Sequence, residues 1–298
     1  MNAAGYSLLI QQLGLSAVPL RLPAIVQPVT RIELIGHTLA VPPAIAPAPD
    51  DLLGHVLFAL KHEGINLAVL AQALPRIPAA AFEQAYQAAP NGIYIRKACY
   101  LREAFTGEPI AQHAPVRVPY SPLFDPERYI TRPGERNAKW RIEFNGLGDL
   151  TYCATVERTP LITELLAHDI LGRAKAFIES LPPIMMDRAL NWAYLHETKD
   201  SFAIEREAPT EDKSRRFIQL LRQAHERQPL TEDYLVSLQN ATVSNPLDMA
   251  AAFRHEQNHL SDGTQGAVGV TYLPPPPELC RELMESLMGF ANEAPTQI

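Results

Sequence analysis

The stretch "FRHEQNHL" holds two histidines and a glutamate at a spacing that binds zinc in many metalloproteases: His255, Glu256 and His259. On a helix, His255 and His259 would share one face, because they lie four residues apart. Glu256 beside them could act as a general base toward a metal-bound water. The HExxH pattern at 255–259 therefore raises the hypothesis of a zinc-dependent hydrolase.

A zinc site of this kind also needs a third protein ligand and an open position for water. No histidine follows His259, and the downstream glutamates lack the Asn-Glu-x-x-Asp context of such enzymes: Glu278, Glu282 and Glu285. A turn begins at Ser261, so we expect His259 at or beyond the end of a helix that starts at Asn245-Pro246. The helix dipole favours a histidine there without a metal. We therefore predict no metal site and favour a capping or solvent-exposed role, with the zinc hydrolase as an alternative.

The composition narrows the classes of partner. The 298-residue chain has 33 acidic and 26 basic side chains and a net charge of −7, which argues against nucleic acid as a partner. Three widely spaced cysteines without a CxxC pair predict reduced thiols and a cytoplasmic location: Cys99, Cys153 and Cys280. No signal peptide is evident, and no run approaches the ~20 apolar residues that span a bilayer, so we expect no membrane partner.

The first half of the chain predicts a mixed, mostly helical module over residues 1–112. A proline-rich stretch at 18–50 favours a β-hairpin or an arm packed on the residues after it. Helical periodicity then runs from Asp50 to Leu74 with a break at Gly64, and further helices are expected over 78–89 and 95–106. These short helices are similar to a helix-turn-helix unit, here expected to dock or pack. Residues 113–158 are expected to form a connector with short strands in "KWRIEFNGL" and "LTYCATV".

The second half, 159–298, predicts a helical domain, which makes the whole chain mainly α. Thr159 and Thr231 are typical N-caps, and Pro160 suits the first position of a helix over 159–181. Further helices are expected over 183–207, after Thr210, after Thr231, from 246 to 259 and over 277–292. A strand over Val270, Thr271 and Tyr272 runs through Leu273 into four prolines at 274–277, which end the strand and begin the last helix.

Two of these stretches, "SFAIER" and "VTYLPPPPE", together resemble the Fic family, enzymes that transfer AMP from ATP to protein hydroxyl groups. Self-inhibited members carry the pattern (S/T)-x-x-x-E-(G/N) on a helix, which this chain matches at Ser201 and Glu205. Arg206 departs from the pattern, because glycine or asparagine is usual there. The segment "FRHEQNHLSDGTQGAVG" is similar to the family's approach to its tongue, and the resemblance covers about 159–293.

The resemblance implies an incomplete helical Fic-type domain with a β-hairpin tongue. Glu205 would pair with an arginine of the catalytic signature and block the γ-phosphate of ATP, and Ser201 would steady the helix. Residues 270–273 would dock a protein target by adding a strand to it. ATP and Mg²⁺ are implied for the complete enzyme, and no cofactor for this chain.

The family's catalytic signature, HPFxxGNGRxxR, does not occur in this sequence. In the family it follows the tongue by roughly one helix, and this chain ends at Ile298, where that helix should begin. We therefore expect a regulatory and target-docking portion that is not catalytic alone. The expected partners are a protein target, the missing catalytic portion and a second copy of the chain. A non-catalytic helical interaction module is a further alternative.

Overall fold

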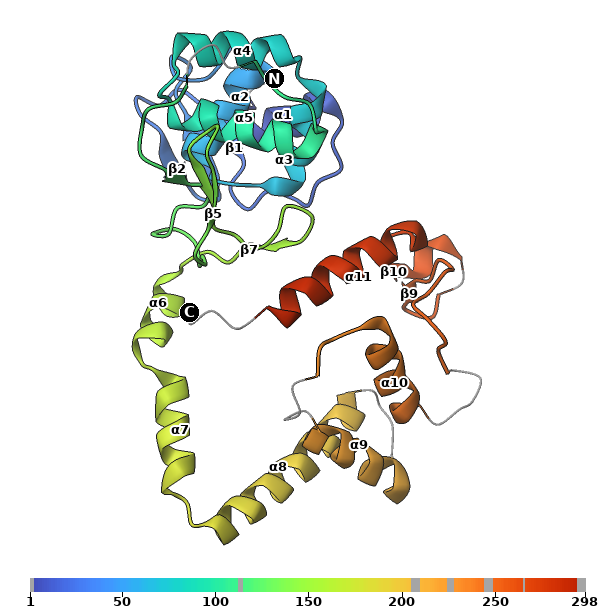
Figure 1. Ribbon diagram of the computed structural model, residues 1–298. Helices are drawn as coiled ribbons and strands as arrows, with labels where there is room; N and C mark the ends of the chain where they lie inside the picture. The colour runs from blue at the N-terminus through green and yellow to red at the C-terminus, as the bar shows by residue number, and fades with distance from the viewer. Residues whose placement is uncertain are drawn as a thin grey trace. The chain divides into compact units, whose positions relative to one another are not determined.

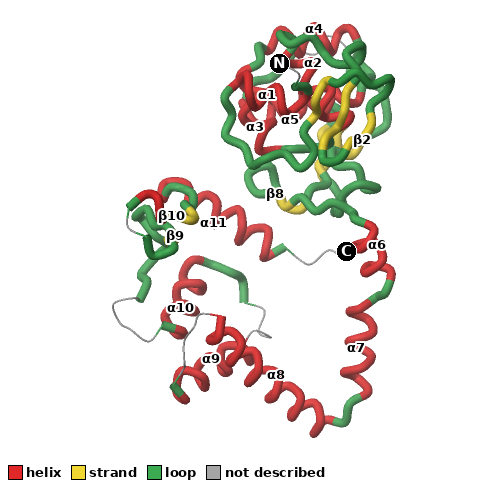
Figure 2. The backbone as a smooth tube through the Cα atoms, turned by 180° about the vertical axis from the view of Figure 1, so that it is seen from behind, coloured by secondary structure: helices red, strands yellow, loops and turns green. Residues whose placement is uncertain are grey.

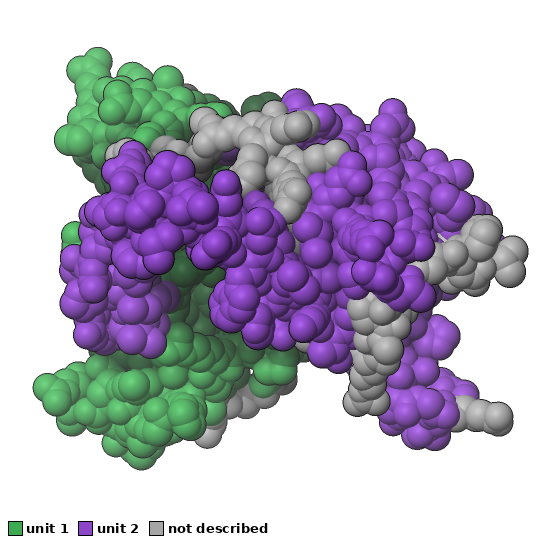
Figure 3. Space-filling view, turned by 90° about the horizontal axis from the view of Figure 1, so that it is seen from below, with its two compact units in different colours: residues 1–158, 298 green, residues 159–297 purple. Residues whose placement is uncertain are grey.

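The computed structural model describes residues 3–111, 115–204, 210–223, 228–243, 249–264 and 266–293 (Figure 1). The chain divides into unit 1, residues 1–158, and unit 2, residues 159–297, which Figure 3 colours separately. Helices are the main secondary structure and the sheets are small (Figure 2), so the fold is a mixed one in which helices dominate. None of the described helices is long and apolar enough to cross a membrane.

The described part of unit 1 contains five α-helices, whose ends follow local sequence signals. Asp51 accepts a hydrogen bond from the Gly54 N–H at the start of the second helix, and Asn66 does the same for Val69 at the third. The break expected at Gly64 is confirmed, because this glycine has φ +97° between those two helices. The helices are α1 (Gly5–Leu13), α2 (Leu52–His62), α3 (Leu67–Ala73), which continues into a 3-10 turn (Leu74–Arg76), α4 (Ala79–Ala88) and α5 (Ile93–Thr106).

Three small sheets complete unit 1 among the described residues. The hairpin expected within 18–50 is confirmed: β2 (Glu33–Ile35) pairs antiparallel with β3 (Thr38–Val41), and β1 (Ala24–Val26) adds a parallel strand. A second sheet has the order β4-β6-β5, with β4 (Ser121–Pro122), β5 (Glu135–Asn137) and β6 (Ile142–Phe144). A last pair joins β7 (Leu147–Gly148) to β8 (Cys153–Ala154).

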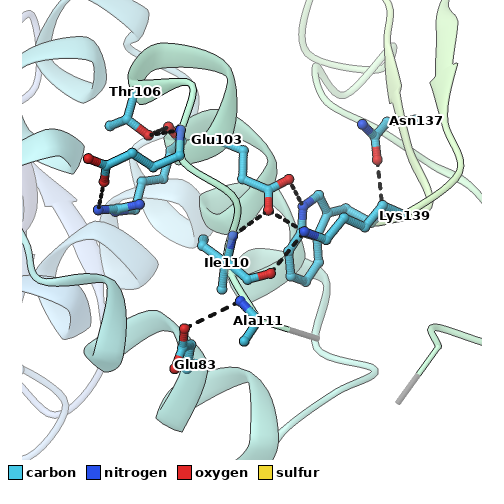
Figure 4. Close-up of polar contacts among 10 residues, drawn as sticks. Glu83, Glu103, Thr106, Ile110, Ala111, Asn137 and Lys139 are labelled. Carbon is cyan, nitrogen blue, oxygen red and sulfur yellow. Dashed lines mark hydrogen bonds and ion pairs between the residues drawn. The ribbon is translucent and has the colours of Figure 1, made fainter. Parts of the chain in front are cut away.

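The core of unit 1 is continuous across its helices and the β6 strand. Trp140 and Tyr86 are fully buried, and their rings meet edge to face at 5.1 Å. Glu103 of α5 accepts hydrogen bonds from the Trp140 Nε1 and the Ile110 N–H, each at 2.7 Å, and from the Lys139 ammonium (Figure 4). The Glu103 carboxylate thereby bonds both the loop after α5 and the β5–β6 turn to α5.

Unit 2 contains six described α-helices and one pair of short strands. The helices are α6 (Pro160–Ala167), α7 (Ile170–Ser180), α8 (Pro183–Ile204), α9 (Glu211–Gln223), α10 (Glu232–Thr242) and α11 (Pro277–Asn292). The strands β9 (Leu260–Ser261) and β10 (Val270–Tyr272) pair antiparallel. The caps expected at Thr159 and Thr231 are confirmed, because their hydroxyls accept hydrogen bonds from the Ile162 and Tyr234 N–H groups.

Two helix predictions in unit 2 are wrong. The helix expected over 159–181 is interrupted at Asp169, which has φ +42° and whose carboxylate accepts the Gly172 N–H to begin α7. The helix expected over 246–259 is not formed by its described part, residues 249–259. There, Asn240 bonds the backbone N–H and C=O of Ala250, and Glu232 accepts the Phe253 N–H at 2.7 Å. These side chains satisfy backbone groups that a helix would have paired internally.

Candidate functional site

The residues expected to dock a target lie on the hairpin formed by β9 and β10. Val270 pairs with Ser261, and Tyr272 pairs with Leu260 across an irregularity. Within the described residues, β10 has a strand partner on one side only. Tyr272 is 55 % exposed and Leu273 is 65 % exposed. Because an unpaired strand edge presents free backbone donors and acceptors, this edge can accept an extended chain.

The proline run at 274–277 is held by the irregular segment that precedes the hairpin. Gln257 Nε2 donates to the Pro274 carbonyl at 3.2 Å, and the Arg254 guanidinium donates to the Pro275 carbonyl. Pro276 then caps α11, and Pro277 occupies its first turn, where the missing N–H costs nothing. The prolines make the connection from the hairpin to α11 stiff, and Figure 2 shows β10 next to the start of that helix.

Helix α11 is bonded to the start of α10 and to the segment just before it. The Arg281 guanidinium lies 3.1 Å from Glu232, the carboxylate that also accepts the Phe253 N–H. At the far end, the Asn292 side chain bonds the Leu230 backbone at 2.7 and 2.9 Å. The hairpin, the proline run, α10 and α11 thus form one hydrogen-bonded framework.

The HExxH residues do not form the geometry that a zinc site needs. His255, Glu256 and His259 are exposed and lie in the irregular segment, so the two imidazoles do not share a helix face. Of the two roles expected for His259, capping or solvent exposure, the second is confirmed, because His259 is exposed and no described helix ends there. The part of the chain that the structure describes contains no group of three or more His, Cys, Asp or Glu side chains placed to hold a metal ion.

The expected inhibitory pair is described only at its first member. Ser201 lies near the end of α8, beside Phe202, whose ring is 5.6 Å from the Phe217 ring of α9. Glu205 and Arg206 lie outside the described residues. In the described part of the chain, no hydrogen bond joins Ser201 to the hairpin, so these two predicted elements are not brought together by a described contact.

Apolar side chains on the helices of unit 2 are largely uncovered. Among its described residues, the only buried positions are Thr198, Phe202 and Gly269. Large hydrophobic side chains stand exposed along α6, α7 and α8: Leu161, Leu165, Leu166, Ile170, Leu171, Phe177, Ile178, Ile184, Met185, Leu190, Trp192 and Leu195. Amphipathic helices normally bury such faces, so this surface is suited to a further polypeptide.

Unit 1 carries a second candidate site that the sequence did not indicate. A cavity of about 310 Å³ lies between the end of α2, the start of α5 and residues 122–129, and a cavity of about 150 Å³ adjoins it. Ile65, Arg128 and Tyr129 line both cavities. Their wall residues come from stretches far apart in the sequence, from Tyr6 to Glu157, so no local motif could have revealed them.

Burial shifts the pKa of several ionisable side chains at these cavities, a glutamate and a lysine among them. Desolvation raises the pKa of Glu63 to about 7, although its carboxylate accepts the Tyr6 N–H at 3.0 Å. Desolvation lowers the pKa of Lys97 to about 8, with Asp125 acting in the opposite direction. A hydrogen bond of 2.7 Å from the Lys97 ammonium to the Leu123 carbonyl holds that side chain at the larger cavity.

Comparisons with models of protein families, with characterised proteins and with solved structures give no significant match.

Proposed function

We propose that this chain is the regulatory and target-docking portion of a Fic-type protein adenylyltransferase, with 159–298 as the incomplete helical Fic-type domain. The observation that carries the proposal is the one-sided pairing of β10, whose open edge runs into a braced proline run. The prolines limit strand pairing to the short stretch 270–273, because they have no N–H to donate. A target segment would thus be held over a few residues beside its reactive hydroxyl.

The uncovered helices of unit 2 agree with a domain that a further polypeptide completes. The chain has no HPFxxGNGRxxR signature, so the base for the target hydroxyl and the phosphate-binding loop would come from that polypeptide. When bound there, Mg²⁺-ATP would supply the AMP group. Exposed apolar residues on α6, α7 and α8 would then become part of a shared core.

Inhibition would depend on the carboxylate of Glu205, four residues after Ser201 in the sequence. A charge-assisted hydrogen bond from an arginine of the signature to Glu205 would compete with the γ-phosphate of ATP for the same guanidinium. Arg206 departs from the family pattern and is a local competitor for that carboxylate.

The first test is the coding sequence beyond Ile298, which should encode HPFxxGNGR or a close variant. A stop codon with no neighbouring gene for a catalytic partner would overturn the proposal. The protein that includes this signature can then be incubated with radiolabelled ATP. Glu205→Gly should raise self-labelling, whereas Glu197→Gly, at an exposed position two turns earlier on α8, should leave it unchanged. Equal labelling of all three proteins would remove the inhibitory role.

Docking is tested separately on the same catalytically complete protein. Leu273→Pro removes the backbone N–H that follows β10, and the loss of a hydrogen bond to the target should lower target labelling about tenfold. Leu273→Met keeps the backbone N–H and an apolar side chain of similar size, so it should retain target labelling. Self-labelling serves as the control for intact catalysis. If Leu273→Pro labels the target as the wild type does, the open edge is not the docking surface.

Two alternatives to the Fic-type function are a non-catalytic interaction module and a zinc-dependent hydrolase. A non-catalytic interaction module would be favoured if the complete protein transfers no label even with Glu205→Gly. The zinc hydrolase has no supporting geometry at His255 and His259, and metal analysis of the purified chain tests it directly.

A further inference from the structure

The larger cavity of unit 1 is a built concave site with a mixed wall. Half of the twelve residues that line it have apolar or aromatic side chains: Leu60, Ile65, Ile93, Tyr94, Leu123 and Tyr129. Its volume of about 310 Å³ matches the lower end of the range for small-molecule sites. A wall of this kind accommodates an apolar or aromatic body.

The charged groups of the wall are predominantly cationic. Lys61, Lys97 and Arg128 line the cavity against a single carboxylate, Asp125. Lys97 is only 7 % exposed, and within the described residues its ammonium has one hydrogen-bond acceptor, the Leu123 carbonyl. An ammonium group has three donors, so this buried cation retains capacity for an oxyanion. Burial makes a charge-assisted contact there stronger than it would be in water.

Arg128 is fixed in place before any ligand arrives. Its guanidinium donates to the Glu63 carbonyl at 2.6 Å, lies 3.4 Å from Glu157, and stacks over the Tyr129 ring at 5.3 Å. These contacts come from three different segments of unit 1. A cation held from several sides loses little conformational freedom on binding, which favours affinity.

We infer that the larger cavity of unit 1 binds a small organic oxyanion, with its carboxylate or phosphate head between Lys97 and Arg128 and its apolar body against Ile65, Ile93 and Leu123. The site lies wholly within unit 1. It is therefore independent of the Fic-type function proposed for unit 2, and either proposal can fail while the other holds.

Phenyl phosphate and benzoate are suitable probes, because each joins an aromatic ring to an oxyanion. Benzyl alcohol and benzylamine carry the same ring with a neutral or a cationic head. Titration of the full chain by calorimetry should detect at least one anionic probe at about 5 mM or below, and the matched probes should bind about tenfold more weakly or not at all. Whichever anion binds more tightly distinguishes a phosphate ligand from a carboxylate ligand.

Two variants locate the binding. Lys97→Met keeps the apolar stem and removes the charge, and Arg128→Gln removes the stacked guanidinium. Each should weaken the anionic probe about tenfold or more, since each removes a charge-assisted contact. Arg31→Gln, at an exposed position of the same unit whose side chain pairs with Glu33, should bind as the wild type does.

Nuclear magnetic resonance of the wild-type chain tests the site even if a variant does not fold. The anionic probe should shift the backbone amide resonances of Ile65, Leu123 and Tyr129. The inference is overturned if neither anion binds, if benzyl alcohol or benzylamine binds equally well, if folded variants keep the wild-type affinity, or if the shifted resonances lie elsewhere.

Discussion

Unit 1 and unit 2 both use helices with apolar faces but differ in what covers those faces. In unit 1, α2 and α5 bury their apolar residues in one continuous core with Trp140, Tyr86 and Phe82. In unit 2, the helices α6 and α7 contain no buried residue. Helical periodicity alone thus specifies which face of a helix is apolar. That face stabilises the fold only where a second surface buries it.

The two units also differ in whether their charged side chains are buried or exposed. Three cations of α5 are buried in unit 1, namely Arg96, Lys97 and Arg102, and each has a hydrogen-bond partner. The described ion pairs of unit 2 lie mostly at the surface, as Lys175–Glu179 and Arg215–Glu211 do. Arg96 and Lys97 bond backbone carbonyls that flank β6 and β4 and so join α5 to that sheet, whereas exposed ion pairs contribute little to stability.

The largest expected effect comes from the two tryptophans, one in each unit. Trp140→Ala should lower the unfolding free energy of unit 1 by about 3–5 kcal/mol, because it leaves a cavity and removes a partner of Glu103. Trp192 is 65 % exposed, so Trp192→Ala should change stability by no more than about 0.5 kcal/mol. Each substitution removes the only tryptophan of the unit that it changes, so denaturant unfolding is followed by far-ultraviolet circular dichroism, which reports on the helices of both units.

The two tryptophan variants test whether the apolar faces of unit 2 are uncovered in solution. If Trp192→Ala costs as much as Trp140→Ala, the apolar faces of unit 2 are covered in solution by another chain. Acrylamide quenching would then find Trp192 as protected as Trp140.

An intermediate effect is expected from the buried carboxylate of Glu63. Burial raises the pKa of the Glu63 carboxyl group from its ordinary value of 4.5 to about 7 in the folded chain. Between these two pH values the folded chain keeps a proton that the unfolded chain has released. The stability from this protonation is full at low pH and is lost as the pH rises through about 7. Relative to Glu63→Gln, the wild type should therefore lose about 1–3 kcal/mol between about pH 5 and pH 8.

The glutamine variant keeps an acceptor for the Tyr6 N–H and has no titrating proton, so it isolates this group from the nearby His55. Denaturant unfolding of both proteins across the pH range measures the difference. A constant difference between them would show that Glu63 titrates as an ordinary exposed carboxylate.

The smallest effect is expected from matched helix caps. Asp51→Ala removes the acceptor for Gly54 and should lower the stability of unit 1 by about 1 kcal/mol. Thr231→Ala removes the acceptor for Tyr234, and its effect should stay within α10, because little packing couples that helix to a core. Amide hydrogen exchange distinguishes the two: protection should fall throughout unit 1 in the first variant and only in α10 in the second.

Local signals predicted the elements of both units better than they predicted the candidate sites. The helix break at Gly64 and the helix starts at Thr159 and Thr231 depend on groups within four residues of one another. The helix expected over 246–259 failed because Asn240 and Glu232 take backbone groups of its described part from outside it. Docking by residues 270–273 and inhibition by Ser201 and Glu205 stay predictions, since the open edge of β10 is compatible with the first and Glu205 lies outside the described residues.

The sequence by itself determined the caps, the turns and the apolar faces, because those depend on dihedral preferences and hydrogen bonds over a few residues. Only the tertiary structure decided which charges are buried and where a cavity opens. Lys97 meets the Leu123 carbonyl 26 residues away, and Glu63 meets the Tyr6 N–H 57 residues away. A buried charge is tolerated only where such a partner is in place, and the position of that partner is a property of the whole chain path.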